Sequence, residues 1–164
     1  MNHETCQEIE CAVARFFDPR RNVIVPNVWW GLDLNHECDL FVLTKAGYAY
    51  EVEIKTSKAD LKADARKRHN HASKKIKRLY FAIPEKLESC IDLIPGRAGV
   101  LVLRPNGAVK KLREAEPNPG ARKLNEKESL HLGQLCSMRI WTLKSALLRL
   151  AAMKNIPLQE VLDL

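Results

Sequence analysis

Two acidic side chains and one lysine are spaced along the chain in a way that suits phosphodiester hydrolysis. Asp39 lies in the alternating stretch Cys38–Thr44, and Glu53 and Lys55 lie in a second stretch, Tyr48–Lys55. Carboxylates are preferred Mg²⁺ ligands, and a bound divalent cation lowers the pKa of water and stabilises charge on a phosphate oxygen. A lysine beside it orients the attacking water or stabilises the pentavalent phosphate. The pattern therefore indicates hydrolysis that depends on Mg²⁺ or Mn²⁺, with Asp39 and Glu53 as metal ligands.

A β-hairpin is the element that must bring these side chains together. The two stretches flank Lys45-Ala46-Gly47, and Gly47 suits the left-handed last position of a three-residue loop. With this loop Asp39 falls opposite Glu53 on one face of the sheet, with Cβ atoms about 4.5–5.5 Å apart. Lys55 follows on that face, about 7 Å along the strand. The opposite face carries an apolar set suited to the core: Cys38, Leu40, Val42, Tyr50, Val52 and Ile54.

The same residues have a simpler interpretation, a surface salt-bridge cluster on a half-exposed sheet. Against it, like charges opposed on a sheet are unfavourable unless something neutralises them, as a divalent cation does. Glu51 shares the face by period-2 counting. It is either a further ligand or a solvated neighbour that helps to hold Lys55, and we favour the neighbour.

Around these residues the chain resembles a known superfamily. Glu37-Cys38-Asp39-Leu40-Phe41-Val42-Leu43 followed by Glu53-Ile54-Lys55 resembles the PD-(D/E)XK nucleases, although Cys38 stands where a proline is expected. The continuation through Thr56–Asp64 and Arg78–Pro84 looks like the MmcB-like branch, whose members are assigned as DNA-repair endonucleases and include small phage proteins. The resemblance spans about residues 22–112. It implies an αβββαβ restriction-endonuclease-like core with catalytic Asp39, Glu53 and Lys55 at one edge of the sheet.

Some members of this superfamily place a further acid on the first helix, near the metal. Here the candidate is Glu8, in a helix predicted by an apolar stripe that includes Ile9 and Ala12 and ends near Asp18-Pro19. The alternative is a solvated helix residue.

The remaining pattern predicts an α/β fold, a mixed central β-sheet flanked by helices, with C-terminal helices. We expect a single nuclease-like domain over residues 1–164, with a core of about 1–113 and a helical extension of about 124–164. The other elements expected are an extended segment at Asn22–Pro26, a helix opening at Ser57, a strand at Arg78–Ile83, a hairpin of Gly99–Leu103 and Ala108–Leu112, a loop at 114–123, and a helical tail from about Asn125 to Lys154.

A basic segment follows the acidic hairpin and predicts DNA as the partner. Lys58, Lys62 and Arg66 recur every four residues, which aligns them on one helix face, and Lys67 and Arg68 follow directly. The net charge of +7 agrees with a polyanionic partner. Such contacts are made to phosphate, so RNA stays open as a substrate. The alternative is a solvated face.

His36 stands near Asp39 and is a further candidate for contact with the scissile phosphate or with water at the metal. A structural histidine is the alternative.

The composition limits the class of protein. A length of 164 residues suits one domain. The first 20 residues hold no basic-then-apolar run, and no apolar stretch approaches the roughly 20 residues that cross a bilayer, so neither a signal peptide nor a membrane partner is expected. The five cysteines lack the paired spacing of a zinc site and are expected to be reduced, mostly buried thiols of a cytoplasmic protein, in a bacterial cell or a phage-infected host.

Three functions of different classes follow. The first is a metal-dependent nuclease that hydrolyses DNA in phage or bacterial DNA repair or processing. The second is a nucleic-acid-binding module that has kept the fold and the basic face but lost the chemistry. The third is a regulatory protein that binds an acidic protein partner. The sequence does not decide between endo- and exonucleolytic cleavage, or between a monomer and a homodimer.

Overall fold

The structure is a computed structural model, and it describes residues 5–29, 31–32, 34, 36–64 and 73–154. The chain divides into two compact units, Met1–Asn125 and Glu126–Leu164, and each is described by itself. Their elements are, in order, α1 (Cys6–Phe17), β1 (Val23–Val28), β2 (Cys38–Leu43), β3 (Ala49–Ile54), α2 (Lys58–Asp64), β4 (Ile76–Pro84), the 3₁₀-helix η1 (Glu85–Leu93), β5 (Gly99–Leu103), β6 (Val109–Arg113) and α3 (Glu126–Lys154).

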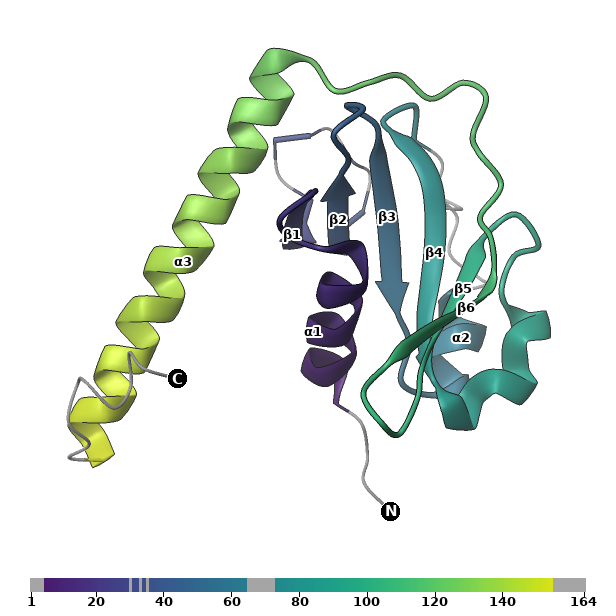
Figure 1. Ribbon diagram of the computed structural model, residues 1–164, viewed down its shortest axis with the longest axis horizontal. Coiled ribbons are helices and arrows are strands. Elements are labelled where there is room, and N and C mark those ends of the chain that lie inside the picture. Colours follow the sequence, from purple (N-terminus) through teal and green to yellow (C-terminus); the bar gives the residue numbers. More distant parts are fainter. Residues whose placement is uncertain (1–4, 30, 33, 35, 65–72, 155–164) are drawn as a thin grey trace. The chain divides into compact units, whose positions relative to one another are not determined.

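The first unit is built on a six-stranded mixed sheet whose strands lie side by side in chain order (Figure 1). The pairs β1–β2, β2–β3 and β5–β6 are antiparallel, whereas β3–β4 and β4–β5 are parallel. Parallel neighbours need a crossover connection, which α2 and η1 provide. The order α1-β1-β2-β3-α2-β4 confirms the mixed, helix-flanked sheet predicted from the sequence.

The two faces of this sheet are covered by different elements. On one face α1 buries Ile9, Ala12 and Val13 in a cluster with even-numbered side chains of β2, β3 and β4. On the other face Leu61 of α2 and Leu87 of η1 join a second cluster with odd-numbered side chains of β4. Both faces are therefore buried, as in sheets that carry crossover connections.

Both predicted hairpin loops form as expected. Gly47 and Gly107 adopt φ values of +83° and +77°, where a Cβ atom would be strained. In the first loop the Thr44 amide donates to the Tyr48 carbonyl at 2.9 Å, which closes the three-residue turn.

Three elements differ from the sequence-based expectation. Strand β1 runs to Val28, two residues past the expected end at Pro26, and pairs there with Cys38 of β2. Strand β4 begins at Ile76, two residues before the predicted start, because it pairs with Ala49 of β3 across an irregular register. The 3₁₀-helix η1 was not predicted, since Glu85–Leu93 shows no strong helical signature other than the preceding Pro84.

The second unit holds α3, a helix of 29 residues close to the predicted tail. Its exposed large apolar side chains are Leu130, Met138, Ile140, Trp141, Leu143, Leu148, Leu150 and Met153. Within the described part of the chain, no helix combines the length and the apolar character that spanning a bilayer demands.

Candidate active site

The β2–β3 hairpin places Asp39 beside the strand that carries Glu53. Leu40 pairs with Val52 and Phe41 with Glu51, which is the register that the Lys45-Ala46-Gly47 loop predicts. At the end of the ladder the Ile54 amide donates to the Asp39 Oδ2 atom at 2.7 Å. A side-chain carboxylate thus serves as the acceptor for a β3 amide, and this bond fixes Asp39 against the Glu53 end of β3.

Lys55 lies between two buried carboxylates. Its Nζ atom donates to Glu53 Oε2 at 2.5 Å and lies 3.2 Å from Asp64 Oδ1. The side chains of Lys55, Glu53 and Asp64 are only 9%, 2% and 4% exposed. The three residues therefore form a buried ion cluster and are not the surface salt bridge that was the alternative interpretation.

Asp64 was not among the site residues predicted from the sequence. It lies in α2, three residues after Leu61, and both side chains are buried. A spacing of three places two residues on one helix face, so Asp64 shares the face that packs on the sheet. An acidic residue on a helix is usually assumed to be solvated. The spacing of Asp64 from the apolar Leu61 was the feature of the sequence that could have identified it as a site residue.

Burial and neighbouring charges shift the ionisation of this cluster. Burial raises the pKa of Glu53, and the charge of Asp39 raises it further, while Lys55 opposes the shift. For Lys55 burial alone would lower the pKa, but Glu53, Asp64 and Asp39 together raise it above its ordinary value. Lys55 is therefore a stable cation, whereas Glu53 carries its charge at a cost in free energy.

Glu51 has a different environment from the one predicted. It is fully buried, and its Oε1 atom lies 2.6 Å from His36 Nε2, so the interpretation as a solvated neighbour that holds Lys55 was wrong. His36 contacts this carboxylate, and its side chain is 6% exposed. The contact with His36, which lies two residues before β2, accounts for the buried environment of Glu51. The other interpretation, that Glu51 is a further metal ligand, stays open.

The cysteines also depart from the expectation in part. All five are free thiols, as predicted, but Cys6 and Cys11 are exposed and only Cys38 is fully buried. The Cys38 sulfur lies within 4.8 Å of ligand atoms of His36 and Glu51, which places it beside Glu51 and outside the cluster under α1. Burial, followed by the charges of Glu51 and Glu53, raises the pKa of this thiol far above its ordinary value.

The predicted DNA-binding residues are described only in part. Lys58 and Lys62 lie on α2 and are exposed. The helix begins as predicted, because the Asp60 amide donates to Ser57 Oγ at 3.1 Å. The other predicted cations, Arg66, Lys67 and Arg68, lie outside the described residues.

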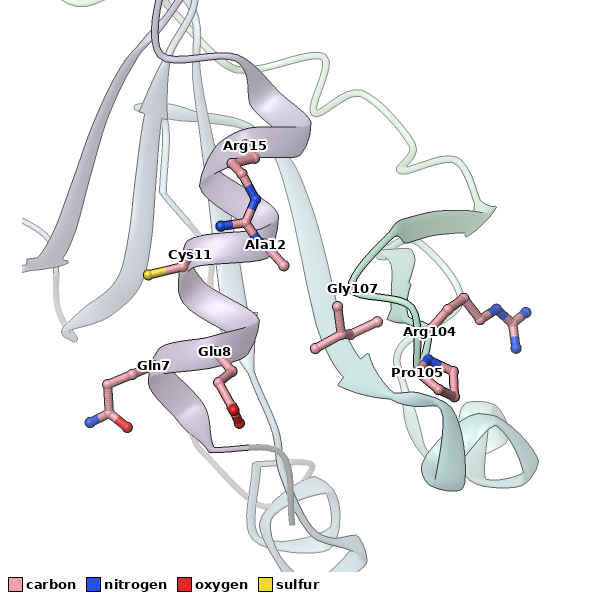
Figure 2. A pocket seen from close by; sticks show the side chains of 9 residues that line it. Gln7, Glu8, Cys11, Ala12, Arg15, Arg104, Pro105 and Gly107 are labelled. Atoms are coloured by element: carbon pink, nitrogen blue, oxygen red, sulfur yellow. The ribbon is translucent and has the colours of Figure 1, made fainter. Parts of the chain in front are cut away.

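Glu8 takes part in a helix cap. Its Oε2 atom accepts a bond from the Thr5 amide at 2.6 Å, and its own amide donates to Thr5 Oγ1 at 3.2 Å, which completes a capping box. Glu8 also lines a cavity of about 520 Å³ between α1 and the β5–β6 turn. Figure 2 shows it there with Arg15 of α1 and with Arg104 and Pro105 of the turn. The carboxylate of Glu8 thus binds Thr5. The acids that contact Lys55 are Glu53 and Asp64.

The donor set around Lys55 suits a divalent cation. Asp39, Glu53 and Asp64 carry three negative charges when ionised and Lys55 carries one positive charge, which leaves an excess of two negative charges. Oxygen donors of carboxylates are the ligands that Mg²⁺ and Mn²⁺ prefer. The types of donor present therefore fit the ion that the sequence implied.

Comparison with known proteins places the chain in a family and confirms the fold. A sequence model described as "DNA repair protein MmcB-like" matches residues 2–145. A solved structure, the SPO1766 protein of unknown function from Silicibacter pomeroyi, is similar with a TM-score of 0.65 and 18% identity, over 89% of this chain and 93% of that one. Among curated proteins no significant match was found.

Proposed function

Because this chain belongs to the MmcB-like family of DNA repair proteins, we propose that it is a metal-dependent nuclease that hydrolyses DNA phosphodiester bonds. The single observation that carries the proposal is the buried cluster of Lys55 with Glu53 and Asp64, beside which the half-buried Asp39 also raises the pKa of Lys55. An acid excess of this kind is costly in a protein interior unless a cation joins it. A nuclease centre accounts for the cost, because the same cation serves the reaction.

The acids have the role of holding the ion. Asp39 and Glu53 would bind Mg²⁺ or Mn²⁺, and Asp64 stands within reach of the same lysine. When bound, the ion supplies positive charge for the phosphate and a more acidic water. The bond from the Ile54 amide to Asp39 Oδ2 leaves the other carboxylate oxygen of Asp39 for this purpose. Glu53 gains from the ion directly, because added positive charge opposes the burial that raises its pKa.

Lys55 has the role of a fixed positive charge. Its contacts with Glu53 and Asp64 hold the ammonium at one point and raise its pKa, so it stays protonated at neutral pH. A preorganised cation stabilises the charge that develops on a phosphate without reorganising during the reaction. Lys55 acts here as an electrostatic stabiliser and not as a base.

The DNA backbone would run along α2. Lys58 and Lys62 are exposed on the helix that also supplies Asp64 to the buried cluster, so phosphate contacts and the acids share one element. Trp29, which follows β1 and is 59% exposed, is available for stacking on an unpaired base.

The proposal is tested by cleavage of supercoiled plasmid and of single-stranded DNA with Mg²⁺, Mn²⁺ or EDTA. The wild type is compared with Asp39→Asn, with Lys55→Ala, and with Lys45→Ala as a control at the exposed hairpin loop. We expect cutting that needs the metal and falls at least about 100-fold in Asp39→Asn and Lys55→Ala, as when an electrostatic stabiliser is removed. Asp39→Asn keeps the shape of the side chain and an acceptor for the Ile54 amide, so its loss of activity reports on charge.

Inert wild-type protein that still binds DNA would contradict the proposal and would favour a nucleic-acid-binding module without chemistry. Equal cutting by wild type and Asp39→Asn would place the activity elsewhere.

A further inference from the structure

A second group of metal-ligand side chains lies next to the acids already described. It consists of His36, Cys38 and Glu51, and the nitrogen, sulfur and oxygen atoms they offer all lie within 4.8 Å of one another. The three come from separate pieces of structure, namely the segment before β2, the first residue of β2, and the middle of β3. His36 and Cys38 are two residues apart in the chain, and the pairing of β2 with β3 brings Glu51 to them.

We propose that His36, Cys38 and Glu51 form a site for a Zn²⁺-class divalent cation, distinct from the acid cluster around Lys55. The types of donor atom determine which metal is expected. A thiolate and an imidazole select zinc and similar transition metals, whereas Mg²⁺ takes oxygen ligands almost exclusively. Three protein ligands with water in the fourth position is a common arrangement for zinc.

The distances are compatible with a tetrahedral ion after small movements. Zinc bonds of about 2.0–2.1 Å to nitrogen or oxygen and about 2.3 Å to sulfur place tetrahedral ligands roughly 3.4–3.6 Å apart. His36 Nε2 and Glu51 Oε1 are now 2.6 Å apart, and the upper limit for the group is 4.8 Å. Side-chain adjustments of about 1 Å would therefore complete the geometry.

The environment is that of a built site. Cys38 and Glu51 are 0% exposed, and the His36 side chain is 6% exposed. The contact with Glu51 already orients the imidazole so that Nε2 faces the group. Leu32, four residues before His36, accepts a hydrogen bond from Lys75, which directly precedes β4.

An ion here would join the strands that carry the other acids. Cys38 directly precedes Asp39, and Glu51 lies two residues before Glu53 on the same face. Zinc would thus fasten the start of β2 to the middle of β3, and binding would release the Cys38 thiol proton to solvent. The site does not depend on the proposed nuclease activity, because its binding is measured without DNA.

The test loads the full chain with metal and counts it. Protein purified under reducing, chelator-treated conditions is incubated with zinc sulfate, freed of excess metal, and analysed for zinc content; a parallel sample receives cobalt chloride for absorption spectra. The variants are Cys38→Ser and Glu51→Gln, with Cys90→Ser as a matched cysteine in η1 and Asp39→Asn as a probe of the neighbouring acids. Circular dichroism establishes that each variant is folded.

We expect about one zinc ion per chain, in keeping with one three-ligand site, and a thiolate-to-cobalt charge-transfer band in the near ultraviolet. The band should vanish in Cys38→Ser and persist in Cys90→Ser and Asp39→Asn, and zinc affinity should fall at least about tenfold in Glu51→Gln. Zinc at 100 times its dissociation constant should shift the folding equilibrium about 100-fold in the wild type.

Three results would overturn the inference. They are a wild type that retains no zinc, a cobalt complex without the charge-transfer band, and zinc binding that survives Cys38→Ser but is lost in Asp39→Asn. The last result would assign the ion to the acid cluster.

Discussion

The β2–β3 hairpin presents two faces that are both buried and yet have opposite chemistry. The apolar face, covered by α1, consists of Leu40, Val42, Val52 and Ile54. The charged face, on the side of α2, consists of Asp39, Glu51, Glu53 and Lys55. Because the side chains alternate along the same strands, the same backbone supports both.

The difference separates what folding needs from what function needs. The apolar face removes hydrocarbon from water, which stabilises the fold by about 25 cal/mol per Å². The charged face works against stability, since each buried ion costs several kcal/mol after relaxation and apolar residues of similar volume often do as well or better. The charged face is therefore best explained by what it binds.

The largest effect on the free energy of unfolding is expected when Lys55, the positively charged residue of the charged face, is replaced. Lys55→Met leaves Glu53 and Asp64 facing each other without a positive charge, and breaking a buried pair in this way costs about 3–5 kcal/mol. Urea unfolding without divalent cations measures the loss, with Lys45→Met at the exposed loop as the control. A variant as stable as the wild type would mean that the lysine is not a structural counter-ion.

A somewhat smaller loss of unfolding free energy is expected from a substitution on the apolar face, with no loss of DNA cleavage. Leu40 is 1% exposed, and Leu40→Ala should cost about 2–5 kcal/mol of unfolding free energy through lost burial and a cavity. The cleavage rate per folded molecule should stay near that of the wild type. Val23→Ala on β1, at a side chain 42% exposed, serves as the control. Loss of cleavage in folded Leu40→Ala would break the separation of the two faces.

The pH dependence of stability should differ between wild type and Glu53→Gln. Burial raises the pKa of Glu53 above its ordinary value of 4.5, so above pH 4.5 the folded chain binds more protons than the unfolded one. A state that binds more protons loses stability as pH rises, so the stability of the wild type relative to Glu53→Gln should fall from pH 4.5 upward. Urea titrations of both proteins from pH 4.5 to 8 without metal measure this difference. A difference that grows with pH would contradict the buried, proton-retaining Glu53.

The smallest effect is expected at the rim, where α2 meets solvent. Replacing Lys58 and Lys62 by glutamine should reduce the slope of log affinity against log salt for duplex DNA by about 1.8, because each phosphate contact contributes about 0.9. Fluorescence anisotropy at several salt concentrations measures it. The double variant Lys45→Gln, Lys110→Gln removes the same charge from exposed positions elsewhere and should leave the slope nearly unchanged. Equal slopes in the two double variants would remove α2 from the DNA path.

The apolar face and the hairpin register could be predicted from the sequence because they follow from local rules. A three-residue loop ending in Gly47 fixes which residues pair, and period-2 alternation then assigns the faces, except at Cys38, whose sulfur lies beside Glu51. The start of α2 at Ser57 follows from its capping hydroxyl in the same way. Each of these features depends on residues close together in the chain.

The partners on the charged face could not be predicted, because they depend on packing between distant segments. Asp64 reaches Lys55 only when α2 lies on the sheet, and Glu51 meets His36 only because the segment before β2 folds back over β3. Charged residues on strands are usually solvated, so the sequence alone gave Glu51 the wrong environment. The role of Glu8 could not be predicted from helix periodicity either, because periodicity does not show that its carboxylate forms a capping box with Thr5.

The central claim is that the charged face holds a divalent cation through Asp39 and Glu53. Isothermal titration calorimetry of Mg²⁺ and Mn²⁺ into the wild type, Glu53→Gln and Glu8→Gln tests it most directly. We expect binding to the wild type, at least about tenfold weaker binding to Glu53→Gln because a first ligand is lost, and unchanged binding to Glu8→Gln. Binding that is the same in wild type and Glu53→Gln, or that is lost instead in Glu8→Gln, would contradict the account.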